Sequence, residues 1–217
     1  MAAAKQLSVT LTEKMMMRFT TSLAVVICLL YATPAWGRWY LDLSAGGGLG
    51  DQTLEANGHL PARVEFDAVT VWRMAVGAGV HYASGFEVGS EVAWSQRGAS
   101  ITLLAGSIFR GVPTTFEYER SYLDVSVGVR QGWNLGPIVV SVAAAPRLSW
   151  LLEEQLQFYH DREPENAVLG IDPELRFAFC RAYAWVKYYW DLTKSYESAT
   201  TEMRDRSLFF GLGLRIP

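Results

Sequence analysis

Apolar and polar residues alternate along most of this chain, and the pattern is clearest near its middle. Leu123, Val125, Val127 and Val129 alternate there with Asp124, Ser126, Gly128 and Arg130. Successive side chains of a β-strand point to opposite faces, so this segment predicts a strand with one apolar face and one charged face. The alternation recurs with glycine and paired charges on the polar side. It therefore predicts a β-barrel that crosses a bilayer, with lipid outside and a polar lumen inside.

The first 37 residues are predicted to be a cleaved signal peptide. Arg18 precedes an uncharged apolar run from Leu23 to Ala32, and Ala35 and Gly37 supply the small residues that signal peptidase requires. We expect cleavage before Arg38. The apolar run is too short for a spanning helix, and no other segment approaches the roughly 20 apolar residues that such a helix needs.

With these boundaries, residues 38–217 are expected to form an outer-membrane β-barrel domain. The methionines at 15–17 offer an alternative start of translation, within the same signal segment. Cys28 falls in the predicted signal, so Cys180 is the only cysteine of the expected mature chain and no internal disulfide can form. We expect Cys180 to be a small buried or lipid-facing residue.

Composition narrows the possible partners. The formal net charge is −3 and basic residues form no cluster, so nucleic acid is not an expected partner. Eight Trp and ten Tyr suit the two interfaces of a bilayer, although aromatic residues also favour strands in general.

We expect an all-β fold, an eight-stranded antiparallel up-and-down transmembrane barrel. The strands are expected at about Trp39 to Gly50, Val69 to Tyr82, Phe86 to Arg97, Phe116 to Arg130, Pro137 to Leu152, Val168 to Phe179, Tyr183 to Leu192 and Arg206 to Ile216. Connections after odd-numbered strands are long and those after even-numbered strands are short, as in bacterial outer-membrane barrels. Pro173 makes the sixth strand the least regular. The apolar segment from Ile101 to Leu104 is an alternative strand region, which leaves ten strands open if the 98–115 connection is itself strand.

The polar faces predict a lumen with five acidic and five basic side chains. These are Asp42, Glu87, Glu91, Asp124 and Asp191, with Arg73, Arg130, Arg147, Lys187 and Arg215. Glycines on the same faces would make room for them, at positions Gly46, Gly48, Gly77, Gly79, Gly89, Gly128, Gly211 and Gly213. Eight strands enclose a space that side chains can fill, and unpaired buried charges are costly. The sequence thus favours a lumen closed by ion pairs over a conducting pore.

Two stretches resemble the PorT-like outer-membrane β-barrel family. They are Gly85 to Gly89 followed by Ala93 to Ala99, and Ser121 to Val125 together with Pro146. The resemblance covers about Arg38 to Ile216 and implies an outer-membrane barrel inserted by the barrel-assembly machinery; it implies no chemistry. Val127 and Arg130 stand where relatives often carry leucine and an aromatic residue, and Pro217 replaces the usual terminal aromatic.

The sequence predicts a non-catalytic integral protein of the cell outer membrane, with a structural role or with external loops that meet an extracellular or envelope protein. No catalytic, cofactor-binding or metal-binding residue and no cofactor is predicted. One alternative is a lipid- or peptide-modifying enzyme with a rim cluster of Asp51, His59, His160 and Asp161. Another is a secreted lipocalin-like carrier with its apolar face inside, since Gly37 to Tyr40 includes a Gly-x-Trp run.

Overall fold

The fold is described from a computed structural model, in which residues 37–56, 64–103, 114–156, 166–194, 196–197 and 201–217 are placed. Ten strands are present in these ranges: β1 (Gly37–Ala56), β2 (Val64–Asp67), β3 (Val69–Tyr82), β4 (Phe86–Leu103), β5 (Thr114–Leu135), β6 (Ile138–Leu156), β7 (Ala167–Phe179), β8 (Ala182–Asp191), β9 (Tyr196–Glu197) and β10 (Thr201–Ile216). Residues 1–36 of the predicted signal peptide lie outside the described residues, whereas Gly37 and Arg38, which flank the predicted cleavage site, lie at the start of β1.

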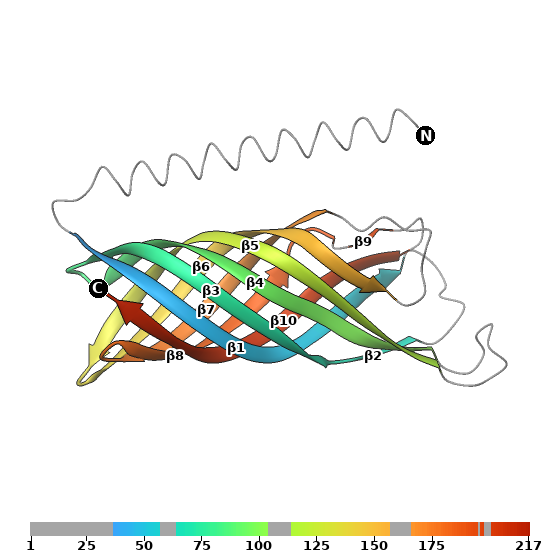
Figure 1. The fold of residues 1–217 in the computed structure, drawn as a ribbon, viewed down its shortest axis with the longest axis horizontal. Helices are drawn as coiled ribbons and strands as arrows, with labels where there is room; N and C mark the ends of the chain where they lie inside the picture. The colour runs from blue at the N-terminus through green and yellow to red at the C-terminus, as the bar shows by residue number, and fades with distance from the viewer. Residues whose placement is uncertain (1–36, 57–63, 104–113, 157–165, 195, 198–200) are drawn as a thin grey trace, which may run out of the picture.

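Eight of these strands close into an antiparallel barrel. Each pairs with its neighbour in the order β1-β3-β4-β5-β6-β7-β8-β10, and β10 pairs back onto β1. Strands β2 and β9 only extend this sheet, along β4 and β10. Figure 1 shows the closed barrel, with the C-terminus at the end that carries the short turns. The predicted eight-stranded barrel is confirmed.

The barrel has a shear of ten residues. Paired residues followed once around the wall lead from Arg38 back to β1 at Gly48, ten residues further along. Strand number and shear together set the tilt and width of a barrel, and eight strands leave an interior just wide enough for side chains.

Strands on the long-connection side extend beyond their predicted ends. β1 continues to Ala56 against β10, and β4 continues to Leu103 against β5. Their backbone groups remain hydrogen-bonded beyond the bilayer, where the outer face no longer meets lipid and an apolar outer face is no longer needed. Residues 98–103 therefore lengthen β4 and do not create two further barrel strands. The short connection between the fourth and fifth predicted strands, expected at 131–136, is shorter still, because β5 runs on to Leu135 and only Gly136 and Pro137 form the turn.

Pro173 is accommodated inside β7. It is paired with Ala144 of β6, whereas the pairing of β7 with β8 omits Asp172 and Pro173. Proline has no backbone N–H, so a ladder is interrupted where that donor would be needed. The predicted sixth strand, β7, is therefore continuously paired with β6, and its pairing with β8 is interrupted at Asp172 and Pro173.

Large apolar side chains cover the outer wall. Examples from the barrel strands are Leu41, Trp72, Val92, Leu123, Val142, Phe177, Val186 and Leu212, all exposed. In water such a surface would be unfavourable, whereas in lipid it is the expected outer face. Among the described residues no helix is long and apolar enough to span a membrane.

Cys180 differs from its prediction. It is exposed in the turn between β7 and β8, with a φ of 54°. A tight turn between paired strands needs a left-handed residue, and here cysteine takes that position. Cys180 is neither buried nor on the lipid-facing wall.

Candidate functional site: the barrel lumen

Glycines on the inner face make room for aromatic rings. A Cβ atom at Gly46 or at Gly211 would lie 2.8 or 2.7 Å from the Trp185 ring. One at Gly79 or at Gly89 would lie 2.5 or 2.9 Å from the Tyr40 hydroxyl. The predicted inward position of these glycines is confirmed, but the side chains that fill the space next to them are rings and not charges.

The rings in turn support arginines. The guanidinium of Arg215 lies 3.8 Å from the centre of the Tyr40 ring, and that of Arg176 lies 3.8 Å from the centre of Tyr183. Cation–π contact of this kind gains strength where water is excluded. Each ring thus fixes the position of a charged group within the lumen.

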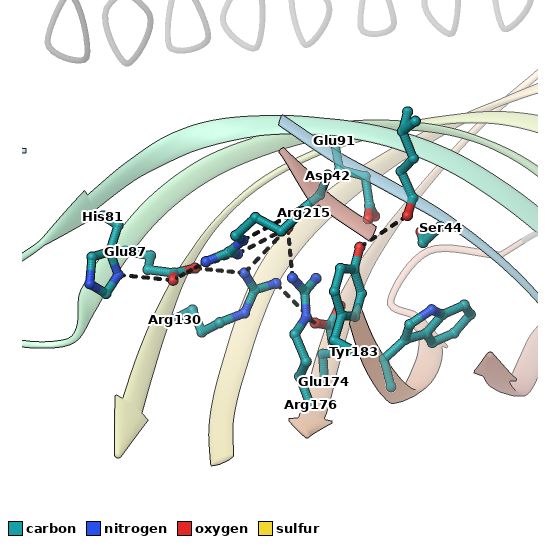
Figure 2. Close-up of polar contacts among 12 residues, drawn as sticks. Asp42, Ser44, His81, Glu87, Glu91, Arg130, Glu174, Arg176, Tyr183 and Arg215 are labelled. Atoms are coloured by element: carbon teal, nitrogen blue, oxygen red, sulfur yellow. Dashed lines mark hydrogen bonds and ion pairs between the residues drawn. The ribbon is translucent and has the colours of Figure 1, made fainter. Parts of the chain in front are cut away.

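Six charged side chains in the lumen form a closed loop in which acidic and basic groups alternate. We call this loop the charge ring. Its members are Asp42, Arg215, Glu87, Arg130, Glu174 and Arg176. Figure 2 shows them converging near the short-turn end of the lumen from β1, β10, β4, β5 and β7.

Every member of the charge ring contacts the next. Arg215 donates to Asp42 at 2.9 Å and to Glu87 at 2.5 Å. Arg130 donates to Glu87 at 2.8 Å and to Glu174 at 2.9 Å. Arg176 donates to Glu174 at 3.0 Å and to Asp42 at 2.6 Å. Each arginine therefore joins two carboxylates, and each carboxylate accepts from two arginines.

Two side chains extend this network along the barrel axis. On the exposed side, Nδ1 of His81 lies 3.0 Å from Glu87. On the other side, Nζ of Lys187 contacts Glu174 at 3.0 Å and Glu91 at 2.7 Å, and Glu91 also pairs with Arg73. Lys187 thus links the charge ring to a second level of charges.

A further group of charged side chains, which we call the loop-side cluster, lies nearer the long connections. It consists of Arg97, Asp124, Arg147, Asp172 and Asp191, all buried. Arg147 donates to Asp172 and to Asp191, at 2.7 Å each, and Arg97 pairs with Asp124.

Tyr189 lies among the arginines of these levels. Its ring centre is 4.2 Å from the guanidinium of Arg147 and 4.9 Å from that of Arg97. Its hydroxyl accepts a hydrogen bond of 2.7 Å from Arg73. One tyrosine thus lies against three arginines of the lumen.

A cavity of about 60 Å³ lies within the lumen, and its lining includes Tyr40, Gly77, Glu91, Gly128, Arg130 and Asp172. Its lining combines members of the charge ring with small residues and with Asp172, whose Oδ2 atom is buried without a hydrogen-bond partner in the described part of the chain. A water molecule needs about 10–15 Å³ and two or more polar partners, so the cavity has room for a few.

All ten predicted lumen charges lie inside the barrel, and Asp124 and Arg130 meet opposite charges as expected. Six further charged side chains of the described residues are also buried inside but were not predicted, namely Arg97, Arg120, Asp172, Glu174, Arg176 and Asp205. The alternation of Asp172, Glu174 and Arg176 was a usable signal, but Pro173 obscured the strand that carries them.

Of the four residues in the alternative enzyme hypothesis, the structure describes Asp51, which is exposed on β1. His59, His160 and Asp161 lie outside the described residues. In the placed ranges, no group of three or more His, Cys, Asp or Glu side chains is arranged to hold a metal ion. The charged lumen also lacks the apolar interior that the lipocalin-like carrier hypothesis requires, so that hypothesis is wrong.

No family model matches this chain, and no curated protein matches it. Among solved structures, the outer membrane protein OprG from Pseudomonas aeruginosa is similar, with a TM-score of 0.53 and 8% identity over 83% of this chain and 97% of that chain. Neisserial surface protein A has a TM-score of 0.45 and 9% identity over 81% of this chain and 96% of that chain. At these identities the likeness to OprG concerns the fold. Together with the apolar outer wall and the polar, filled lumen, it identifies an eight-stranded β-barrel of the outer membrane.

Proposed function

We propose that this protein is a non-catalytic barrel whose lumen is closed, and that it serves the outer membrane as a rigid anchor for its external connections. The charge ring is the observation that carries this proposal. Its six side chains come from five strands and lie across the lumen near the short-turn end.

The ring is difficult to open because its members share their partners. If Arg130 swings away, both Glu87 and Glu174 lose a donor. Separating a buried ion pair without replacing the lost partner costs about 3–5 kcal/mol. The rings of Tyr40 and Tyr183 hold two of the three arginines in addition. These contacts favour a closed lumen over a pore that conducts at rest.

The long strands support the anchoring role. About 9–11 tilted residues cross the hydrocarbon layer, whereas β4 has 18 residues and β5 has 22. Their excess length continues the barrel wall beyond the bilayer on the side of the long connections. A sheet held by backbone hydrogen bonds is a stiff support for loops that contact an extracellular or envelope protein.

We also propose that the chain is a divergent member of the PorT-like family and is inserted by the barrel-assembly machinery. The proposal rests on the segments Gly85–Gly89, Ala93–Ala99 and Ser121–Val125. In the structure Gly85 lies in the turn before β4, Phe86–Gly89 and Ala93–Ala99 lie on β4, and Ser121–Val125 lies on the adjacent strand β5.

Single-channel recording in planar bilayers tests the closed lumen. The refolded protein is added to a bilayer next to a sixteen-stranded porin as the positive control. We expect no steady conductance from this protein. Stable steps with the wild-type chain, proportional to salt concentration, would contradict the proposal. Heat-modifiable gel migration of the same sample shows that the barrel is folded in the recording.

A further inference from the structure

The outer face of β10 marks one edge of the bilayer. Its outward side chains Leu208, Phe210, Leu212, Leu214 and Ile216 are 42%, 55%, 72%, 47% and 41% exposed. They span nine residues, which matches the about 9–11 residues of a transmembrane β-strand. The next outward position toward the long connections is Arg206, which therefore lies at the level of the lipid headgroups.

The two strands beside β10, β8 and β1, also place the edge of the bilayer at the level of Arg206. Arg206 is paired with Trp190 of β8, which is 47% exposed, and with Asp51 of β1. On β1 the last outward apolar residue is Leu49, and Asp51 follows it. Tryptophan at the boundary of an apolar band is typical of a membrane interface.

This sector of the wall carries basic groups. Arg204 and Arg206 share the outward face of β10, both are half-buried, and the Nε atom of Arg206 is buried with no hydrogen-bond partner. One acidic residue, Asp51, lies opposite Arg206. The corresponding level of β4 and β5 is different, since Gln96 there donates a 2.7 Å hydrogen bond to Glu119.

We propose that Arg206, with Arg204 beside it, binds the phosphate of an anionic lipid headgroup in the outer leaflet. A guanidinium presents paired N–H donors that match phosphate oxygens, and such a pair is stronger next to a low-dielectric layer. Trp190 and Leu208 flank Arg206 on the wall and would contact the apolar part of the same lipid. The site would occupy the β8–β10–β1 sector and leave the opposite sector without bound anionic lipid.

Lipid retention tests this site. The protein is placed in phosphatidylcholine nanodiscs that contain lipid A with both phosphates or the same lipid A with its phosphates removed. Native mass spectrometry then counts the lipid that each barrel retains on release. We expect the wild type to prefer the phosphorylated lipid. The preference should fall about fivefold for Arg206→Gln and about fivefold again for Arg204→Gln/Arg206→Gln, because one basic side chain near a membrane surface contributes roughly this factor.

Arg181→Gln is the matched control, since Arg181 is exposed in the β7–β8 turn at the opposite end of the barrel. The Arg181→Gln variant should prefer the phosphorylated lipid A as strongly as the wild type does. The ratio of the two lipids is measured on the same folded molecules, so a lower yield of a variant does not change it. Equal retention of both lipids by the wild type, or an unchanged ratio in the double variant, would overturn the proposal. Displacement of lipid A by millimolar inorganic phosphate would also overturn it, because the site would then be one for free phosphate.

Discussion

Arg215 and Asp42 are cross-strand neighbours, and the guanidinium of Arg215 donates to both carboxylate oxygens of Asp42, at 2.9 and 3.0 Å. They lie on β10 and β1, the last and first strands, so this bidentate pair spans the seam at which the barrel closes. We expect a coupling free energy of about 1.5–3 kcal/mol between them, as for hydrogen bonds to charged groups. A double-mutant cycle with Arg215→Met and Asp42→Asn, measured by urea unfolding in lipid vesicles, checks this value. Additive effects would show that the seam does not depend on the pair.

Arg147 is the fully buried centre of the loop-side cluster. Its guanidinium donates to the carboxylates of Asp172 and Asp191 at 2.7 Å each, and Arg147→Met removes both hydrogen bonds. We expect the free energy of unfolding to fall by about 3–5 kcal/mol. The triple variant that also carries Asp172→Asn and Asp191→Asn should recover part of this loss, since the uncompensated charges are gone. No recovery would mean that lost packing, and not charge, explains the effect.

Leu212 lies at the centre of the apolar band on β10 and is 72% exposed. If that surface faces lipid, Leu212→Arg should reduce the free energy of unfolding in vesicles by about 2–4 kcal/mol. Leu208→Arg is the control, because the same charge near the interface costs only about 0–1 kcal/mol. Equal costs at the two positions would show that the band is not centred as described.

Removal of two members of the charge ring should open the lumen. In Arg130→Ala/Arg215→Ala, both arginine partners of Glu87 are lost and Asp42 keeps only Arg176. The short-turn end then carries excess negative charge and less side-chain volume. We expect small, cation-selective conductance steps in planar bilayers, whereas Arg181→Ala should remain silent. If the double variant is folded and equally silent, the loop-side cluster is sufficient to close the lumen.

The predicted signal peptide has a direct test. Small residues at Ala35 and Gly37 predict that signal peptidase cleaves before Arg38. Intact mass spectrometry of protein extracted from outer membranes should therefore give the mass of residues 38–217. The mass of a chain that begins at any of the methionines would contradict this cleavage.

The alternation of apolar and polar residues determined much of the fold. The predicted strand Val69–Tyr82 has the same bounds as β3. The order of the strands, with short turns after the even-numbered ones, predicted eight antiparallel strands. This is possible because a two-residue period is local: each strand shows its lipid face and its lumen face without reference to its neighbours. The strand ends above the bilayer were missed, since no apolar face marks them there.

Only the tertiary structure decided which charges meet. Balanced signs predicted ion pairs in the lumen, but the partners in the charge ring are up to 173 residues apart, as with Asp42 and Arg215. Their meeting depends on barrel closure with a shear of ten residues, which is set by pairing around the whole wall. The sequence by itself thus determined a membrane wall with a charged interior. Closure determined that its charges form a continuous ring, because register in a closed sheet is a property of all eight strands together.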